Sequence, residues 1–176
     1  MNDVIIRHVL PRDLDECFLV EISGFPPEEA ATRGTIKLRL ETFPQGFLVA
    51  QMDGRVVGML NSGATDKQDI SDEELKQLIG HDPNGKNMVV FALVILPEFQ
   101  KRGIAQQLMT RFVEEARARK KKNVLLLCKQ HLIAYYERMG FVHLSLSRSM
   151  HGGAEWHEMR LALQQVCPGF IRTLVL

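Results

Sequence analysis

The sequence predicts an α/β domain built on a mixed, mostly antiparallel sheet. Two continuous apolar runs, residues 88–96 and 123–128, are separated by a segment with helical spacing of its apolar residues. A strand, a helix and a second strand in this order imply a right-handed crossover and two parallel neighbours. Asp53-Gly54 marks a two-residue hairpin turn, and residues 141–163 contain two alternating runs. These signals indicate antiparallel strands on both sides of the parallel pair.

The elements of the N-terminal half follow from local signals. In order we expect a strand at 4–9, a helix at 13–22, a loop at 23–27, a helix at 28–41 and a hairpin at 46–63. Pro11 and Asp13 open the first helix, because proline is tolerated in a first helical turn. Gly34 is a weak point of the second helix.

The C-terminal half holds the predicted crossover. Residues 64–87 are polar and read as an inserted connection, with a short helix near 71–79 capped by Ser71 and Glu74. The crossover helix has a one-sided apolar stripe, which predicts that it packs on the sheet. The stripe consists of Ile104, Ala105, Leu108, Met109, Phe112, Val113 and Ala116. A short helix follows near 131–140, and residues 141–150 and 154–163 form a terminal pair.

Composition limits the class of protein. The chain has 176 residues and a formal net charge of +1, so no global field draws it to nucleic acid or a membrane. Its three cysteines form no CxxC pair and show no metal-ligand spacing, which is typical of a reducing compartment. With no signal-peptide pattern and no apolar run of about 20 residues, we expect a cytoplasmic protein without a metal. We expect one domain over 1–176, with a core of about 4–164 and a tail at 165–176.

The junction Gln100–Ala105 is the first candidate binding site. It lies between a buried strand and an amphipathic helix, and the first turn of a helix exposes unpaired N–H groups and a partial positive charge. Gly103 lacks the Cβ that would obstruct a phosphate, and Lys101 and Arg102 add positive charge. The junction matches neither the dinucleotide fingerprint nor the P-loop. A glycine that serves only the turn is the alternative interpretation.

The same residues resemble a known motif. Gln100, Arg102, Gly103 and Ala105 match Q/R-x-x-G-x-G/A, the acetyl-coenzyme-A motif of the GNAT N-acetyltransferase superfamily. The later residues 125–159 are similar to its arylalkylamine branch and the bacterial relatives of that branch. The resemblance implies a six- to seven-stranded sheet with a splayed central parallel pair and helices on both faces.

The resemblance also implies acetyl-coenzyme A as co-substrate. The residues that it places at the coenzyme are Leu93, Val94, Ile95, Gln100, Lys101, Arg102, Gly103, Ile104, Ala105, His131, Ile133 and Tyr136. A helix terminus contributes about 0.3–1 kcal/mol per charge, whereas micromolar binding needs about 8 kcal/mol. The pantetheine arm, paired with main chain near Leu93 and Ile95, is therefore expected to supply much of the affinity.

Acetyl transfer to an amine requires a proton acceptor and a proton donor. In the family the second aromatic residue of the segment around Tyr135 and Tyr136 protonates the coenzyme sulfur, which assigns the donor to Tyr136. A core tyrosine with a satisfied hydroxyl is the alternative.

The base is open. Val89 and Phe91 stand where relatives carry a histidine pair, so deprotonation through water is the working hypothesis. An alkylamine with a pKa of about 10.4 is only about 0.04% neutral at pH 7, so some acceptor for its proton is needed. The remaining candidates are His131, Cys128, His151 and Glu29.

The predicted function is acetyl transfer to a primary amine by direct attack in a ternary complex. The acceptor expected from the resemblance is a small arylalkylamine or a polyamine, contacted by Phe25, Pro26 and Tyr135. Two alternatives stay open: acetylation of a protein or peptide amine, and a non-catalytic acyl-coenzyme-A sensor. Homodimers are common in the family, and the apolar tail could contribute to one.

Overall fold

The sheet of the computed structural model, which describes residues 3–163, has the strand order β1-β2-β3-β4-β5-β7-β6. Its strands are β1 (Ile5–His8), β2 (Phe47–Met52), β3 (Arg55–Thr65), β4 (Asn87–Ile95), β5 (Asn123–Cys128), β6 (Val142–Leu146) and β7 (His157–Ala162). All neighbouring strands are antiparallel except β4 and β5, which are parallel. The mixed sheet predicted from the sequence is thus confirmed.

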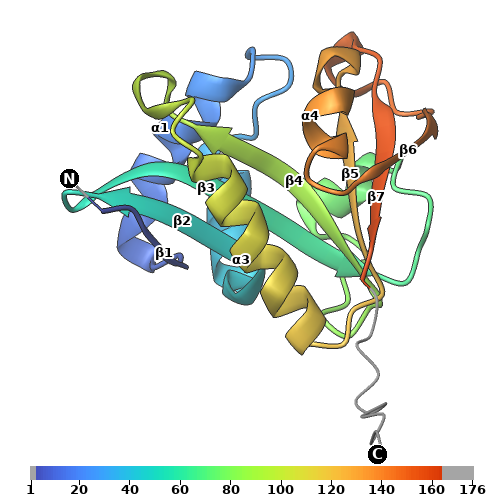
Figure 1. Cartoon of the computed structure of the whole chain (residues 1–176), viewed down its shortest axis with the longest axis horizontal. Helices are drawn as coiled ribbons and strands as arrows, with labels where there is room; N and C mark the ends of the chain where they lie inside the picture. The colour runs from blue at the N-terminus through green and yellow to red at the C-terminus, as the bar shows by residue number, and fades with distance from the viewer. Residues whose placement is uncertain (1–2, 164–176) are drawn as a thin grey trace, which may run out of the picture.

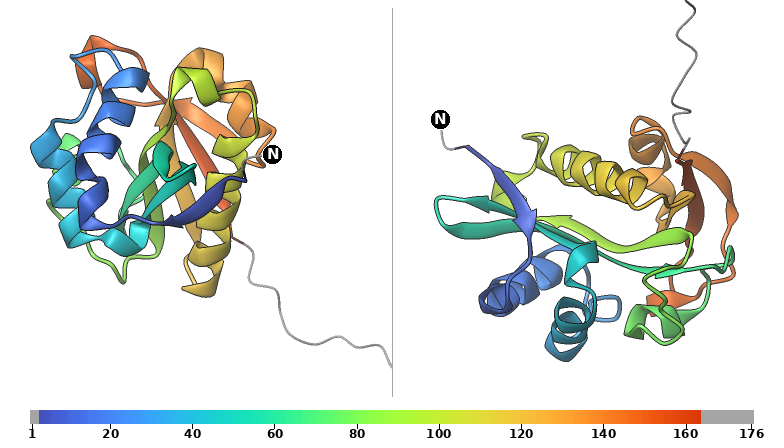
Figure 2. Two further views of the ribbon diagram at one scale, coloured as in Figure 1. Left: turned by 90° about the vertical axis from the view of Figure 1, so that its left-hand side faces the viewer. Right: turned by 90° about the horizontal axis from the view of Figure 1, so that it is seen from below.

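Helices cover both faces of the sheet (Figure 1). They are α1 (Leu14–Gly24), α2 (Arg33–Thr42), α3 (Ile104–Ala118) and α4 (Ile133–Glu137). Short 3₁₀ helices span Pro11–Asp13, Pro44–Gly46, Glu73–Gln77, Pro97–Phe99, Gln130–Leu132 and His151–Gly153. Figure 2 shows α3 on one face and the pair α1 and α2 on the other. The sheet is therefore the middle layer of three.

This layering explains the two strongest sequence patterns. Strand β4 lies between helices on both faces, so its side chains from residue 88 to 95 are apolar on both sides. A strand with one face in solvent would instead alternate apolar and polar residues. The stripe on α3 faces the sheet, and six residues of the helix are buried. These are Ile104, Leu108, Met109, Phe112, Val113 and Ala116.

The parallel pair separates partway along its length. Strand β4 pairs with β5 only from Asn87 to Val90, opposite Asn123 to Leu126. The next residue, Phe91, is an extra residue in β4, because Val90 and Ala92 face consecutive residues of β3. Such a β-bulge bends its strand and disrupts the ladder. The splayed pair implied by the resemblance is confirmed. Among residues 3–163, one edge of β4 has no strand partner from Phe91 to Ile95.

Three local expectations were wrong. Helix α2 begins at Arg33 and not at residue 28, because Thr32 accepts a hydrogen bond from the Thr35 N–H and caps it there. The expected helix at 71–79 is the 3₁₀ helix Glu73–Gln77, and its cap is Asp72. The terminal strands are shorter than predicted, so residues 147–156 form a long loop between β6 and β7.

Two other expectations concern the chain ends and the membrane. The tail 165–176, with Cys167 and the apolar residues suggested for a dimer, lies outside the described residues. Within residues 3–163, the longest and most apolar helices fall short of what a membrane span requires.

Candidate active site

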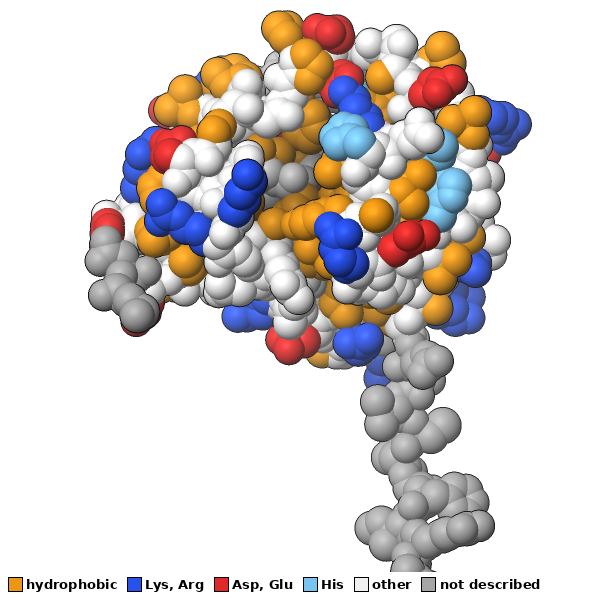
Figure 3. Space-filling view, turned by 45° about the horizontal axis from the view of Figure 1, so that its top comes forward, with side chains coloured by type: hydrophobic (Ala, Val, Ile, Leu, Met, Phe, Trp, Pro, Cys, Tyr) orange, Lys and Arg blue, Asp and Glu red, His pale blue; other side chains and the backbone are white. Residues whose placement is uncertain are grey.

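A cavity of about 440 Å³ occupies the opening between β4 and β5. Its walls include Val89–Leu93 of β4 and Leu126–Cys128 of β5. Side chains of α1, α2, the Glu73–Gln77 3₁₀ helix and the 147–156 loop complete it on the face opposite α3. Figure 3 shows a hollow with hydrophobic side chains inside it and basic side chains beside its opening. The bulge and the loss of strand pairing thus create the space for a ligand.

Tyr136, in helix α4, lies on the wall of this cavity. Its side chain is only 8% exposed, and its ring packs edge-on against Tyr135 at 5.3 Å and Phe141 at 5.7 Å. Burial, with the nearby Cys128 thiol, raises the pKa of the Tyr136 hydroxyl above its ordinary value. The hydroxyl therefore carries its proton throughout the neutral range.

Cys128, another wall residue, is unsuited to carry an acyl group. Its side chain is buried, and desolvation raises the pKa of the thiol to about 11. The thiolate is the nucleophilic form, so it is scarce at neutral pH. The side chain instead fills apolar space beside Tyr136.

The junction before α3 forms a tight turn. Lys101 and Gly103 adopt φ of +61° and +77°, and Gly103 is the N-cap of the helix. The first amide that bonds back to the turn is that of Gln107, which donates to the Gly103 carbonyl at 3.1 Å. In residues 3–163, the four preceding amides, 103–106, have no hydrogen-bond acceptor. They form a group of donors at the positive end of a helix.

Two side chains hold this turn, one against the end of β4 and one against the Pro97–Phe99 3₁₀ helix. Gln100 Nε2 donates to the Ile95 carbonyl at 3.0 Å, and Arg102 donates to the Glu98 carbonyl at 3.1 Å. The Arg102 guanidinium also lies 5.3 Å from the centre of the Phe99 ring. A Cβ built on Gly103 meets no atom of the described residues beyond its chain neighbours within 4 Å, so the surface over the turn is open.

The predicted site residues fall into three groups. Phe25, Leu93, His131 and Tyr136 line the cavity. Gln100, Lys101, Arg102, Gly103, Ile104 and Ala105 form the turn and the start of α3. Val94, Ile95, Pro26, Ile133 and Tyr135 lie close in the chain to these groups but are not wall residues. The roles suggested for all of them remain predictions.

The candidate bases differ in their surroundings. His151 is held between two acceptors, the Glu29 carbonyl at 2.9 Å from Nε2 and Glu73 Oε2 at 2.8 Å from Nδ1. His131 is exposed at the cavity wall. Glu29 is buried, and Lys129 bonds to its Oε1 at 2.7 Å.

Charged residues that the sequence did not reveal also line the cavity. Glu21 of α1 and Arg39 of α2 are both buried. Arg39 donates to the Lys76 carbonyl and to Asn61 Oδ1, and desolvation lowers its pKa to about 10. Neither Glu21 nor Arg39 belongs to a sequence motif. Only the packing of α1 against α2 identifies them as residues of the cavity wall.

The geometry fits a coenzyme with a diphosphate and an extended arm. Unpaired main chain of β4 borders the cavity, as an extended pantetheine chain would require. The open turn with four free amides, 103–106, offers donors to phosphate oxygens. A thioester in the opening would meet the side of the cavity that holds Tyr136.

Comparison with known proteins agrees with this geometry. The model of the acetyltransferase (GNAT) family matches residues 11–141. The chain therefore belongs to that family. Among solved structures, the loading GNATL domain of CurA from Lyngbya majuscula has a TM-score of 0.81, with 17% identity, over 92% of this chain and 98% of that one. At this identity the likeness shows the fold.

Curated relatives are distant in sequence. Serotonin N-acetyltransferase of Mesocricetus auratus is 25% identical over 94% of this chain and 84% of its own length. The probable hydrolase YhcX of Bacillus subtilis is 25% identical over 70% of this chain. The chain spans only 25% of the length of YhcX.

Proposed function

We propose that this protein transfers an acetyl group from acetyl-coenzyme A to a primary amine of a small molecule, and that residues 1–176 form one N-acetyltransferase domain. The observation that carries the proposal is the cavity itself. It lies in the opening of β4 and β5, with a protonated buried tyrosine on its wall, and the Arg102–Ala105 turn follows the end of β4. The similarity to serotonin N-acetyltransferase supports an arylalkylamine as acceptor, and a polyamine is the other candidate.

In this proposal each group has a defined role. The amides of 103–106 bind the diphosphate, and the free edge of β4 near Leu93 aligns the pantetheine arm. The amine attacks the thioester directly, in a ternary complex. Tyr136 donates its proton to the departing sulfur, because its raised pKa keeps it protonated. The proton of the amine leaves through water.

The shape of the cavity favours a small acceptor over a peptide. A volume of about 440 Å³ lies within the range of small-molecule sites. The 147–156 loop also closes over the acceptor side, where the His151 side chain bonds to the Glu29 carbonyl. A protein substrate would require an open groove at this place.

The test is a coenzyme-release assay with acetyl-coenzyme A and a panel of amines, with acetylated products identified by mass. The panel contains 2-phenylethylamine, butane-1,4-diamine and a short peptide with a free N-terminus. Release with a small amine supports the proposal, and release only with the peptide would replace it. Tight binding of acetyl-coenzyme A without release for any amine would favour a sensor.

A further inference from the structure

Two glutamates of the cavity wall each have a buried carboxylate oxygen without a hydrogen-bond partner in the described part of the chain. Glu21 and Glu29 are only 3% and 7% exposed, and Oε2 of each has no hydrogen-bond partner among the described residues. Both residues line the same cavity. A buried acceptor without a donor costs free energy, and more when it is charged. The cavity therefore has an unmet requirement for hydrogen-bond donors.

Local structure holds the two carboxylates in place. Glu21 Oε1 accepts the N–H of Ala31 at 2.9 Å, and the turn that carries Glu29 is closed by two amides that donate to the Pro26 carbonyl. Lys129 occupies the other oxygen of Glu29. In each glutamate, Oε1 is therefore held by a hydrogen bond or ion pair, and Oε2 is the oxygen that has no partner.

The charge on Glu21 is also uncompensated by an ion pair. Arg39 and His151 act on it electrostatically, but neither bonds to it. The Arg39 guanidinium donates to the Lys76 carbonyl and Asn61, and the His151 ring contacts the Glu29 carbonyl and Glu73. Among the described residues, no cation lies within ion-pair distance of Glu21. An ammonium group would supply both the charge and the donors.

Two aromatic rings of the cavity wall, those of Phe91 and Trp156, already have cations close to them. The Arg39 guanidinium lies 4.7 Å from the centre of the Phe91 ring. Lys76 and Lys129 lie 5.8 and 5.6 Å from the centre of the Trp156 ring. An aryl group would compete with these cations, whereas an ammonium would meet acceptors that have no partner.

We infer that Glu21 and Glu29 bind a second ammonium group of the acceptor, so that the substrate is an alkyl diamine and not a monoamine. This inference rests on the proposed function and specifies its acceptor. One amine, in its neutral form, attacks the thioester. The other remains protonated at the two carboxylates and holds the substrate in place.

The experiment compares butane-1,4-diamine with butan-1-amine, which has the same carbon chain without the second nitrogen. We expect kcat/KM for the diamine to be at least about tenfold higher, as a charged hydrogen bond implies. Glu21→Gln keeps the acceptor for Ala31 but removes the charge. It should raise KM for the diamine about 10- to 100-fold, with little change in kcat or in the kinetics of butan-1-amine.

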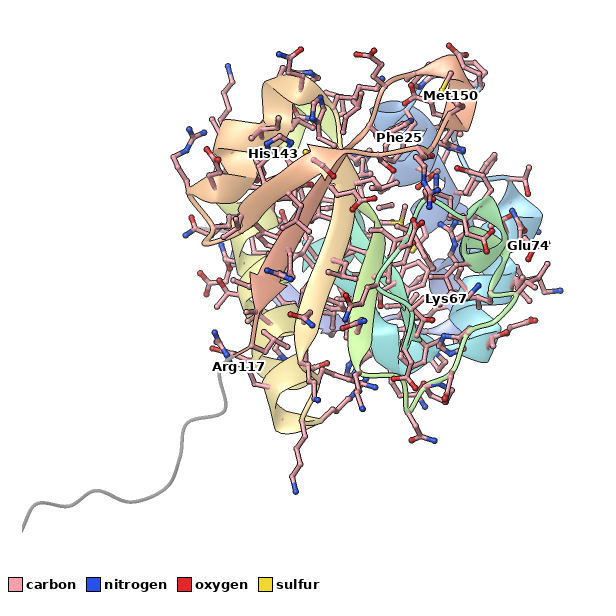
Figure 4. All side chains as sticks on the ribbon, turned by 90° about the vertical axis from the view of Figure 1, so that its right-hand side faces the viewer. Phe25, Lys67, Glu74, Arg117, His143 and Met150 are labelled. Atoms are coloured by element: carbon pink, nitrogen blue, oxygen red, sulfur yellow. The ribbon has the colours of Figure 1, made fainter. Side chains whose placement is uncertain are left out.

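Glu74→Gln is the matched control, because Glu74 is exposed at the periphery of the molecule (Figure 4) and outside the cavity wall. It should leave both substrates unchanged. Equal kinetics for the two amines in the wild type, or equal losses for both in Glu21→Gln, would overturn the inference. The proposed acetyltransferase activity would not be contradicted by that result.

Calorimetric binding of butane-1,4-diamine to the full chain with coenzyme A separates the two proposals. Binding that Glu21→Gln abolishes supports the ammonium site, even if no amine is acetylated. Absence of binding to the wild type overturns it. If Glu21→Gln does not fold, Glu29→Gln takes its place in both measurements.

Discussion

Val90 pairs with Leu126 in the last parallel contact between β4 and β5, and the chain is bulged at the very next residue. One irregularity therefore ends a ladder, frees an edge of main chain and opens a cavity beneath it. Strand β4 keeps its antiparallel partner β3 as far as Ile95, which leaves this edge anchored from the other side. The opening is thus a rigid feature of the sheet rather than a gap between loops.

Gly103→Ala should weaken the binding of acetyl-coenzyme A about tenfold. A Cβ at φ +77° strains the backbone by about 1 kcal/mol and adds a methyl group on the open surface of the turn whose amides we assign to the diphosphate. Gly54→Ala is the control, because Gly54 has φ +79° and open space around its Cβ but lies in the β2–β3 hairpin. Titration calorimetry should show lost affinity in the first variant alone. Similar affinity in both would contradict the assignment of the turn.

Tyr136→Phe should lower kcat by about a hundredfold or more and leave the affinity for acetyl-coenzyme A nearly unchanged. General acids contribute this much, and the ring that packs against Tyr135 and Phe141 is kept. Tyr135→Phe removes a hydroxyl from the neighbouring ring, which is not on the cavity wall, and should cost far less turnover. Steady-state kinetics with direct binding measurements separates the two effects. Undiminished turnover in Tyr136→Phe would remove the donor role.

Local sequence was sufficient to predict the elements around the Gln100–Ala105 turn. The run of β4, the stripe of α3 and the glycine between them lie within 88–116, and each depends on its neighbours in the chain. The bulge at Phe91 has no such signal, because it is a property of pairing with β3. Only the family resemblance indicated that the strands separate.

The cavity wall opposite α3 could not be predicted from local sequence. Glu21, Arg39 and Trp156 meet at one cavity although they are far apart in the sequence. A glutamate or arginine in a helix usually faces solvent, so burial of these two is a tertiary effect. Thr32 likewise determined where α2 begins, because its side chain caps the helix at a place where sequence periodicity gave no boundary.

Glu21→Gln should make the protein more stable at pH 7–8 and have no such effect near pH 4. Burial raises the pKa of Glu21 above 4.5, against smaller opposing effects of the Ala31 N–H, Arg39 and His151. The folded state thus binds this proton more tightly than the unfolded state. Stability from this group is present below pH 4.5 and is lost as pH rises through the folded pKa.

Urea unfolding of wild type and Glu21→Gln at several pH values checks this sign. The difference in the free energy of unfolding should grow from about pH 4.5 upward and then level off. Added diamine should reduce the difference at neutral pH, because an ammonium would compensate the charge of Glu21 in the wild type. A variant that is less stable at neutral pH would contradict the uncompensated burial of this carboxylate.

Gly152→Ala should damage the acceptor side selectively, and its neighbour provides the control. Both Gly152 and Gly153 have positive φ, +61° and +71°, so alanine strains either position similarly. A Cβ on Gly152 would lie 2.5 Å from Glu29 Cγ and 3.1 Å from the Glu28 carbonyl oxygen, whereas one on Gly153 meets nothing within 4 Å. The first variant must therefore push the 147–156 loop away from the turn that carries Glu29, at a further cost of about 1–3 kcal/mol.

We expect Gly152→Ala to have a lower melting temperature and a severalfold higher KM for the amine than Gly153→Ala. KM for acetyl-coenzyme A should be unchanged, because the Arg102–Ala105 turn lies on other elements. Equal kinetics in the two variants would show that contact between the loop and Glu29 does not shape the acceptor site.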